Sequence, residues 1–280
     1  MSQHRIVITP DPMDRAYWRD IWKYRELFYF LAWRDIIVRY KQTVIGIAWS
    51  LFRPLITLLV MAFLGWLFNS ELPGDVPRLL LVGAATMPWT FFSTAFEGSA
   101  NSLIANSNLL TKVYFPRLIV PASTVIVSLI DLAISFVLLL ILMAAHGFLP
   151  DHRILYLPVF LLLALVTALG AGLLIAALNV KYRDFRHIIP FMVQFGLFVT
   201  PVAFSSADIY GNERIPAAVK VLYSLNPMVS VIDGFRWCLL RGETMIHTYG
   251  FISSAVIAIL LLVAGIIRFR RTERGFADVI

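Results

Sequence analysis

Long uninterrupted apolar runs are the feature of this 280-residue sequence that most constrains its fold. A helix needs about 20 apolar residues to cross the hydrocarbon core of a bilayer. Six runs reach or approach that length, at residues 44–68, 79–96, 118–145, 154–180, 188–204 and 248–267. Only 15% of the residues are charged, whereas about a quarter are charged in soluble domains. We therefore expect an all-α integral membrane protein with six transmembrane helices.

The expected membrane domain covers residues 44–280 and leaves no room for a separate soluble domain. Acidic residues interrupt the first 30 residues, so we expect no cleavable signal sequence. Seventeen of the 24 Lys and Arg residues fall in alternate segments that include both ends of the chain, and six fall in the opposite loops. The positive-inside rule then places both termini in the cytoplasm. The net charge of +7 is interpreted as topology, and no nucleic-acid partner is expected.

Residues 1–43 form the expected cytoplasmic N-terminus, and part of this segment has an amphipathic pattern with helical period. One face carries Tyr17, Trp18, Ile21, Trp22, Tyr24, Phe28 and Tyr29, and the other carries Arg19, Asp20, Lys23 and Glu26. Because Trp and Tyr are enriched at membrane interfaces, the pattern predicts a helix lying on the cytoplasmic surface of the membrane. A helix packed on a soluble partner is the alternative.

Residues 205–244 form a long loop on the exterior side, with an apolar stretch at 215–240. Asn226-Pro227 and Asp233-Gly234 interrupt this stretch, so a clean span is not expected. Short re-entrant helices that dip into the outer leaflet fit the pattern better.

Sequence motifs for chemistry on this chain are missing. There is no phosphate loop, no nucleophile elbow and no metal-ligand spacing among the five His residues and the single cysteine, Cys238. We expect no catalytic residue, no metal and no cofactor in this chain. Any ATP and Mg would be bound by a separate partner subunit.

The cytoplasmic loop at residues 106–117 is more apolar than a solvated loop needs to be. It predicts a short capped helix that ends before Pro116. The helix could lie in a groove of a partner protein, or it could be a turn packed within this chain. The residues alone leave both interpretations open.

Arg53 lies inside the first apolar run, where an unpaired charge is costly. Glu97 and Asp131 are the candidate carboxylates for an ion pair with it. The alternative is that Arg53 faces an aqueous path and binds a diphosphate through its planar guanidinium.

Two aromatic stripes follow the helical period in the first and fifth runs. Their residues are Trp49, Phe52, Phe63 and Trp66 in the first run and Phe191, Phe195 and Phe198 in the fifth. Such stripes often face lipid or pack between helices.

Five segments, in order, resemble the permeases of type-2 ABC exporters for O-antigen-type polysaccharides, a family that includes teichoic acid and galactan exporters. The resemblance runs from about residue 27 to the C-terminus. It rests on residues 39–49, on 112–117 with Pro121, on 179–184, on 200–202 and on 226–228. One departure is Arg53, which precedes Pro54 where many relatives carry an uncharged residue, so no role is transferred to it.

The resemblance implies a homodimer in the bacterial inner membrane that binds two cytoplasmic ABC ATPase subunits and exports undecaprenyl-diphosphate-linked polysaccharide. It implies that the N-terminal helix guards the channel entrance and that the two aromatic stripes line a conduit between protomers. The cytoplasmic cluster Lys181, Arg183, Asp184 and Arg186 would contact the ATPase or the entering diphosphate. The coupling helix to the ATPase would include Asn108, Leu109, Leu110, Lys112, Val113, Tyr114, Phe115 and Arg117.

Two rival functions remain at this stage. One is a type-2 ABC exporter of a small drug or lipid, which needs a narrower path than a sugar chain. The other is a membrane-embedded glycosyltransferase acting on the lipid carrier, which would require clustered catalytic acids, and the acids here are dispersed. The glycan itself is not named by the sequence.

Overall fold

The computed structural model of the protein describes residues 15–41, 52, 55–60, 63, 67, 76–182, 184–244 and 247–273. Within these residues the secondary structure is helical, with no β-strand. The helices are α1 (Arg15–Lys23), α2 (Arg25–Lys41), α4 (Arg78–Ala105), α5 (Ser107–Lys112), α6 (Ile119–Ala145), η1 (His152–Tyr156), α7 (Leu157–Lys181), α8 (Phe185–Val199), α9 (Ser206–Gly211), α10 (Ala217–Ser224), α11 (Pro227–Leu239) and α12 (Thr248–Thr272).

Four helical segments of the described chain are long and apolar enough to cross a membrane: α4, α6, η1 with α7, and α12. They match the predicted spans at 79–96, 118–145, 154–180 and 248–267. The main difference in bounds is at the C-terminal end of α4, which continues past the predicted end at residue 96 to Ala105. Its extra turns remain helical and packed, because Ser99, Ala100 and Leu103 are almost completely buried.

The other two predicted spans are not seen as long apolar helices among the described residues. The span at 44–68 lies largely outside the described residues, although residues 55–60 are helical. The span at 188–204 corresponds to α8, which has only 15 residues and begins three residues early. A helix of this length is shorter than the roughly 20 residues needed for a crossing. The count of six spans therefore stays a prediction.

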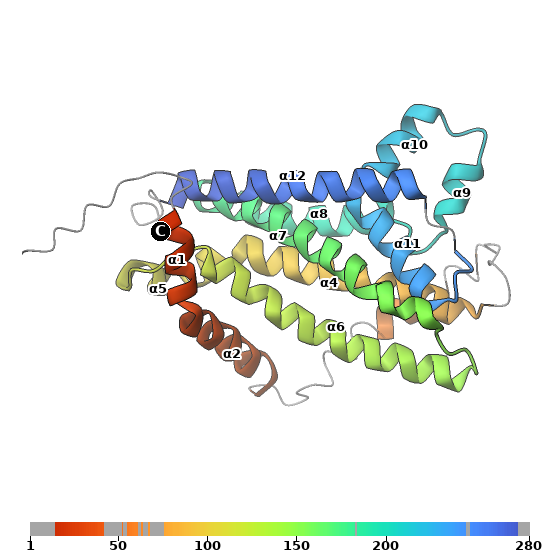
Figure 1. The fold of residues 1–280 in the computed structure, drawn as a ribbon, viewed down its shortest axis with the longest axis horizontal. Coiled ribbons are helices and arrows are strands. Elements are labelled where there is room, and N and C mark those ends of the chain that lie inside the picture. The colour runs from red at the N-terminus through yellow and green to blue at the C-terminus, as the bar shows by residue number, and fades with distance from the viewer. Residues whose placement is uncertain are drawn as a thin grey trace, which may run out of the picture.

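The long helices run lengthwise through an elongated bundle, with their connections at its two ends (Figure 1). Helix α4 packs against both α6 and α7, and α7 also packs against α12. Helices α1 and α5 lie at one end, together with the C-terminal end of α12 (Figure 1). We call this the α5 end. Helices α9 and α10 lie at the opposite end, which we call the α9 end (Figure 1).

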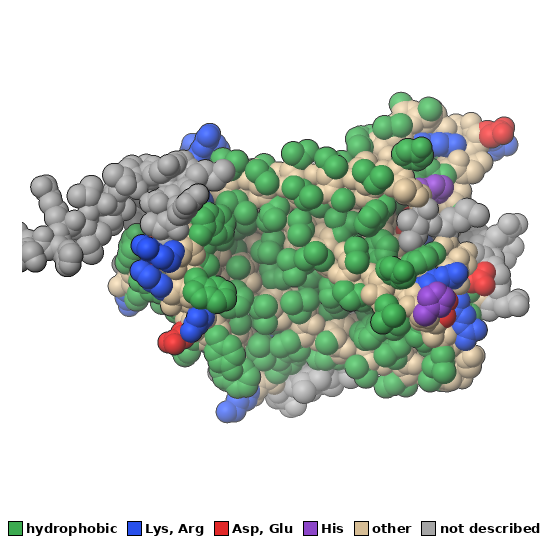
Figure 2. Space-filling model, viewed as in Figure 1, with side chains coloured by type: hydrophobic (Ala, Val, Ile, Leu, Met, Phe, Trp, Pro, Cys, Tyr) green, Lys and Arg blue, Asp and Glu red, His purple; other side chains and the backbone are tan. Residues whose placement is uncertain are grey.

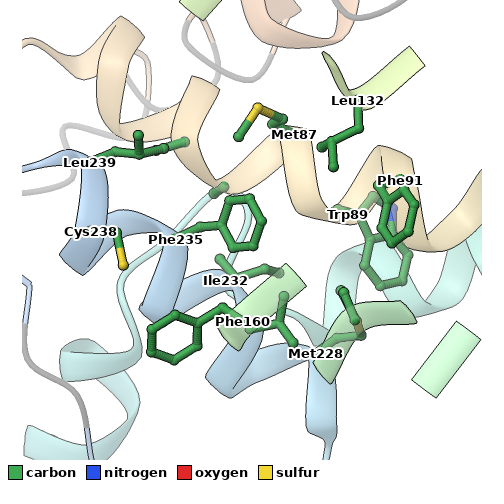
Figure 3. Packing of buried hydrophobic residues seen from close by; sticks show 14 of the residues in the cluster. Met87, Trp89, Phe91, Leu132, Phe160, Met228, Ile232, Phe235, Cys238 and Leu239 are labelled. Atoms are coloured by element: carbon green, nitrogen blue, oxygen red, sulfur yellow. The ribbon is translucent and has the colours of Figure 1, made fainter. Parts of the chain in front are cut away.

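The main hydrophobic core joins α4, α6, α7 and α11. Phe160 lies close to Ile232 and Phe235 of α11 (Figure 3). Helix α11 runs without a break through Asp233 and Gly234, so these two residues interrupt the apolar sequence but not the helix. Gly234 is needed for packing, because a Cβ atom at this position would lie 2.1 Å from the Phe160 ring. The predicted break at Asn226-Pro227 is confirmed, since it separates α10 from α11.

Close contact between α7 and α12 depends on two glycines. A Cβ atom at Gly170 would lie 2.6 Å from the backbone nitrogen of Leu262, and one at Gly265 would lie 2.5 Å from the carbonyl oxygen of Gly170. Real Cβ atoms do not approach backbone this closely. The two helix backbones can therefore touch only because these positions have no side chain.

The N-terminal segment forms two helices that meet at Tyr24, and its predicted aromatic face is divided. Ile21, Tyr24 and Phe28 pack against a second core cluster that contains Leu31 and Phe269. The neighbouring flank of the same helices is exposed, and it carries Trp18, Trp22, Tyr29 and Trp33. One part of the predicted membrane-facing surface thus packs within the chain, and only the other part is available to lipid.

Apolar side chains cover most of the visible surface between the two ends of the bundle, while charged side chains gather near those ends (Figure 2). Exposed apolar side chains of the long helices include Leu162 on α7 and Ile259 and Leu260 on α12. An apolar surface of this extent suits contact with lipid rather than with water.

Candidate functional site

Helix α5 is a short exposed element at the α5 end. It covers Ser107–Lys112, and Val113 after it is extended. The predicted helix at 108–115 therefore begins one residue too late and continues three residues too far. The extended backbone lets Phe115 reach the second core cluster, where it is buried. Proline at 116 also disfavours the α conformation for the residue before it.

The apolar residues of this segment divide between the inside and the outside of the chain. Leu110 and Phe115 are buried in the second core cluster, and Leu109 packs against it. Val113 and Tyr114 are instead 50% and 77% exposed. Each of the two interpretations of the segment thus describes part of it: three side chains anchor it to the chain, and two are presented outward. Asn108 and Lys112 are exposed beside them.

Hydrogen bonds hold both ends of the segment to other helices. Asn106, which precedes α5, accepts a hydrogen bond from Arg34 Nη2 of α2 at 2.7 Å. Arg117, which follows it, donates from its backbone nitrogen to Glu273 Oε1 at 2.8 Å. Sequence reasoning assigned no role to Arg34 or Glu273, because their partners are distant in the chain.

Asp131 forms a polar contact between α6 and the end of α2. Its Oδ2 lies 2.6 Å from Arg39 Nη2, and its Oδ1 accepts a hydrogen bond from Tyr40 at 2.5 Å. The Asp131 side chain is 10% exposed. Its predicted partner Arg53 lies outside the described residues, so that pairing and the diphosphate role stay predictions. Glu97 is partly buried on α4.

This contact also locates the end of α2. Asp131 is twelve residues into α6, which corresponds to about 18 Å along a helix axis. Helix α2 therefore follows α6 well into the bundle, and its C-terminal end does not lie at the α5 end with α1 (Figure 1).

The aromatic stripe of the fifth run is present on α8 as predicted. Phe191, Phe195 and Phe198 are 67%, 60% and 66% exposed. The rings of Phe191 and Phe195 are stacked, with centroids 6.2 Å apart. Of the first-run stripe, Phe52 and Phe63 are exposed, while Trp49 and Trp66 lie outside the described residues. The role of both stripes in lining a channel stays a prediction.

The predicted cytoplasmic cluster lies at the junction of α7 and α8. Lys181, Asp184 and Arg186 are exposed there, and Arg183 lies outside the described residues. The Lys181 ammonium lies 5.2 Å from the centroid of the Tyr182 ring. The exposed cations are accessible to a partner or an anionic ligand, and neither role is tested by this geometry.

Arg236 is one of the six cations that the sequence places in the exterior loops, and its side chain is buried rather than solvated. The side chain is 1% exposed inside α11. It donates hydrogen bonds to the carbonyl oxygens of Leu81, Val202 and Phe204 at 3.3, 3.2 and 2.9 Å. It thereby joins α4, α11 and the turn after α8.

Asp233, one helical turn earlier in α11, accepts a hydrogen bond from Ser206 Oγ of α9 at 2.7 Å. Burial raises the pKa of its carboxyl group to about 6, while Ser206 and the Arg236 charge act in the opposite direction. Two opposite charges three residues apart in an apolar stretch are the sequence signal that could have identified this buried cluster.

Across the part of the chain that the structure describes, no three His, Cys, Asp or Glu side chains are grouped so that they could hold a metal ion. The polar clusters that do exist join helices: Asp131 with α2, Arg236 with α4, and Glu273 with the loop after α5. The candidate functional surfaces are the exposed side chains that follow α5 and those on the exposed face of α8.

Comparison with known proteins gives a family and several relatives. Residues 26–240 match the family described as ABC-2 type transporter. The chain is 29% identical to the O-antigen export system permease protein RfbA of Myxococcus xanthus over 262 residues, which cover 94% of this chain and 98% of the relative. It is 23% identical to a Klebsiella pneumoniae protein of the same name over 258 residues, covering 91% and 95%. A second Klebsiella pneumoniae protein of that name is also 23% identical over 260 residues, again covering 91% and 95%.

Proposed function

Because the chain belongs to the ABC-2 type transporter family, we propose that it is the permease subunit of an exporter for O-antigen-type polysaccharide linked to undecaprenyl diphosphate. The proposal is supported by the names of relatives that align over more than nine tenths of the chain. It is further supported by the apolar bundle, in which four helices of the described residues are long and apolar enough to cross a membrane. Two copies of the chain and two separate ATPase subunits would form the working exporter in the bacterial inner membrane.

We place the α5 end in the cytoplasm. Helix α1, the α5 segment and the last turn of α12 gather basic side chains there, including Lys23, Lys112, Arg270 and Arg271. Basic residues are enriched in cytoplasmic segments of membrane proteins. In this orientation α5 faces the ATPase, and α9 to α11 lie on the exit side.

The single structural observation that carries the docking of an ATPase on this chain is the outward pair Val113 and Tyr114, which follows α5 in the anchored segment from Asn106 to Arg117. Aromatic side chains at the centre of an interface often contribute most of the binding free energy. The buried anchors Leu110 and Phe115 would transmit a push on this pair into the bundle, because they sit in the second core cluster.

Tyr114→Ala is expected to weaken binding of the ATPase subunit by at least about tenfold. The side chain is 77% exposed, so its loss should leave the fold of the permease intact. Co-purification of a tagged permease with the co-expressed ATPase measures the association, and surface O-antigen measures export.

Tyr249→Ala is the matched control, since Tyr249 is 91% exposed at the start of α12, far from α5. It should leave both measurements unchanged. Normal ATPase recovery and normal export with Tyr114→Ala would refute the assignment of α5 as the docking element.

The exposed stripe on α8 is proposed to line the glycan path between two protomers. Replacing Phe195 and Phe198 together with Leu keeps an apolar surface and removes two rings on which sugars can stack. We expect glycan export to fall about two- to tenfold, the range that one aromatic contact of 0.5–1.5 kcal/mol spans. Pulse labelling of surface glycan in cells measures the rate.

The matched control is a double change on the exposed face of α12, Val256→Ala with Ile259→Ala. It shortens two exposed apolar side chains on another helix without removing a ring, and export should continue at the normal rate. If the α8 variant also exports normally at equal membrane abundance, the stripe faces lipid and the channel assignment is lost.

A further inference from the structure

Glu273 lies directly after α12 and connects three separate parts of the α5 end. Its Oε1 accepts a hydrogen bond from the backbone nitrogen of Arg117 at 2.8 Å, and its Oε2 accepts one from the Tyr17 hydroxyl at 3.1 Å. Its own carbonyl oxygen accepts a hydrogen bond from Arg117 Nη1 at 2.6 Å. One residue thus joins α12, the loop after α5, and α1.

A cation–π contact lies beside these hydrogen bonds. The Arg270 guanidinium lies 3.7 Å from the centroid of the Tyr17 ring, which gives α12 and α1 a second contact. Burial raises the pKa of the Glu273 carboxyl, while the hydrogen bond from the Arg117 backbone opposes this change. Gln has the same reach as Glu and offers both an acceptor and a donor for these two partners.

The other end of the α5 segment is held by α2. Arg34 Nη2 donates to Asn106 Oδ1 at 2.7 Å and also contacts Asp35 Oδ1 at 2.6 Å. The segment from Asn106 to Arg117 is therefore tethered at both ends, by α2 at its start and by Glu273 at its end. Neither tether uses the exposed pair Val113 and Tyr114.

We propose that Glu273 is a positioning residue that transfers movement of the α5 segment to α1 and α12. This inference rests on the proposed docking of an ATPase on α5 and goes beyond it, because it concerns what happens after docking. When the ATPase moves α5, the loop at Arg117 moves with it. The hydrogen bonds at Glu273 then carry the displacement to α12 and, through Tyr17, to the N-terminal helix.

A purely structural role predicts a different result from a coupling role. If Glu273 only stabilised the fold, its loss would lower the abundance of the permease and its ATPase binding together. If it couples movement, the complex should assemble and hydrolyse ATP while export fails. The ratio of glycan exported to ATP hydrolysed separates these two cases.

Glu273→Ala in the full permease, co-expressed with its ATPase, is expected to keep ATPase recovery and ATP hydrolysis within about twofold of normal. Surface glycan per complex should fall at least about tenfold, the effect of losing hydrogen bonds to a carboxyl group. Glu273→Gln should restore export, because Gln can accept from the Arg117 backbone and donate to the Tyr17 oxygen. Glu243→Ala, an exposed Glu at the α9 end, is the matched control and should behave normally.

Tyr17→Phe provides a milder test, because it removes one hydroxyl group and keeps the ring under Arg270. It should lower export per ATP by a smaller factor than Glu273→Ala, and combining the two should add no further loss.

Normal export with Glu273→Ala would overturn the inference, and so would a loss of ATPase binding with that variant. Failure of the Gln variant to restore export would also overturn it. These results differ from the failure of the docking proposal, in which Tyr114→Ala would leave ATPase binding and export intact.

Discussion

Gly170→Ala is expected to destabilise the protein strongly, although it adds a single methyl group. The new Cβ atom would lie 2.6 Å from the nitrogen of Leu262 and 2.7 Å from the carbonyl carbon of Leu261. These are backbone atoms of α12, so no side-chain rotation can relieve the contact. Overpacking in a dense core costs about 1–3 kcal/mol and occasionally more, and we expect the upper part of this range.

Thermal unfolding of the purified protein in detergent measures this effect. Gly211→Ala is the matched control, because a Cβ atom at Gly211 has nothing within 4 Å. The control should unfold at the normal temperature, and Gly170→Ala should unfold several degrees lower. Equal unfolding temperatures for both variants would mean that α7 and α12 do not touch at Gly170.

Arg236→Met is the second substitution that we expect to lower the stability of the protein strongly. The substitution keeps an apolar stem in α11 and removes the donors to the carbonyl oxygens of Leu81, Val202 and Phe204. A buried polar group left without a partner costs about 1–3 kcal/mol. Asp233 would also lose the favourable effect of the Arg236 charge. We therefore expect a loss of several kcal/mol and separation of the turn after α8 from α11.

Limited proteolysis checks this expectation, since the turn at residues 200–205 should become accessible to protease in the variant. Arg236→Lys keeps the charge but has one nitrogen for three acceptors, so an intermediate result is expected. Arg214→Met is the control, because Arg214 is exposed near α10. Unchanged stability and unchanged cleavage in Arg236→Met would show that the three hydrogen bonds contribute little.

Much of the fold could be predicted from apolar run length. The spans at 118–145 and 248–267 differ from α6 and α12 by at most five residues at either end. The length of an apolar run does not predict the bounds of short helices such as α5 and α8, because local packing decides where these helices end. Phe115 illustrates this, since its burial in the second core cluster accompanies the extended backbone after α5.

Candidate site residues were predictable where exposure follows from helical spacing, and not where a distant partner decides the role. The stripe Phe191, Phe195 and Phe198 is on one exposed face, as the spacing predicts. Arg236 and Glu273 were missed. Charge counting treats every Arg in a loop region alike, and it cannot distinguish a solvated guanidinium from one that binds three buried carbonyl groups.

The sequence by itself determined the helical class, the apolar body and most of the long helices, because lipid requires runs of about 20 apolar residues with every backbone hydrogen bond made inside the helix. Only the tertiary structure decided which polar groups meet. Tyr17 and Glu273 are 256 residues apart in the chain, and Arg117 and Glu273 are 156 apart. Such pairs depend on how the helices pack, and packing depends on three-dimensional contacts such as the one at Gly170 that no local pattern in the sequence encodes.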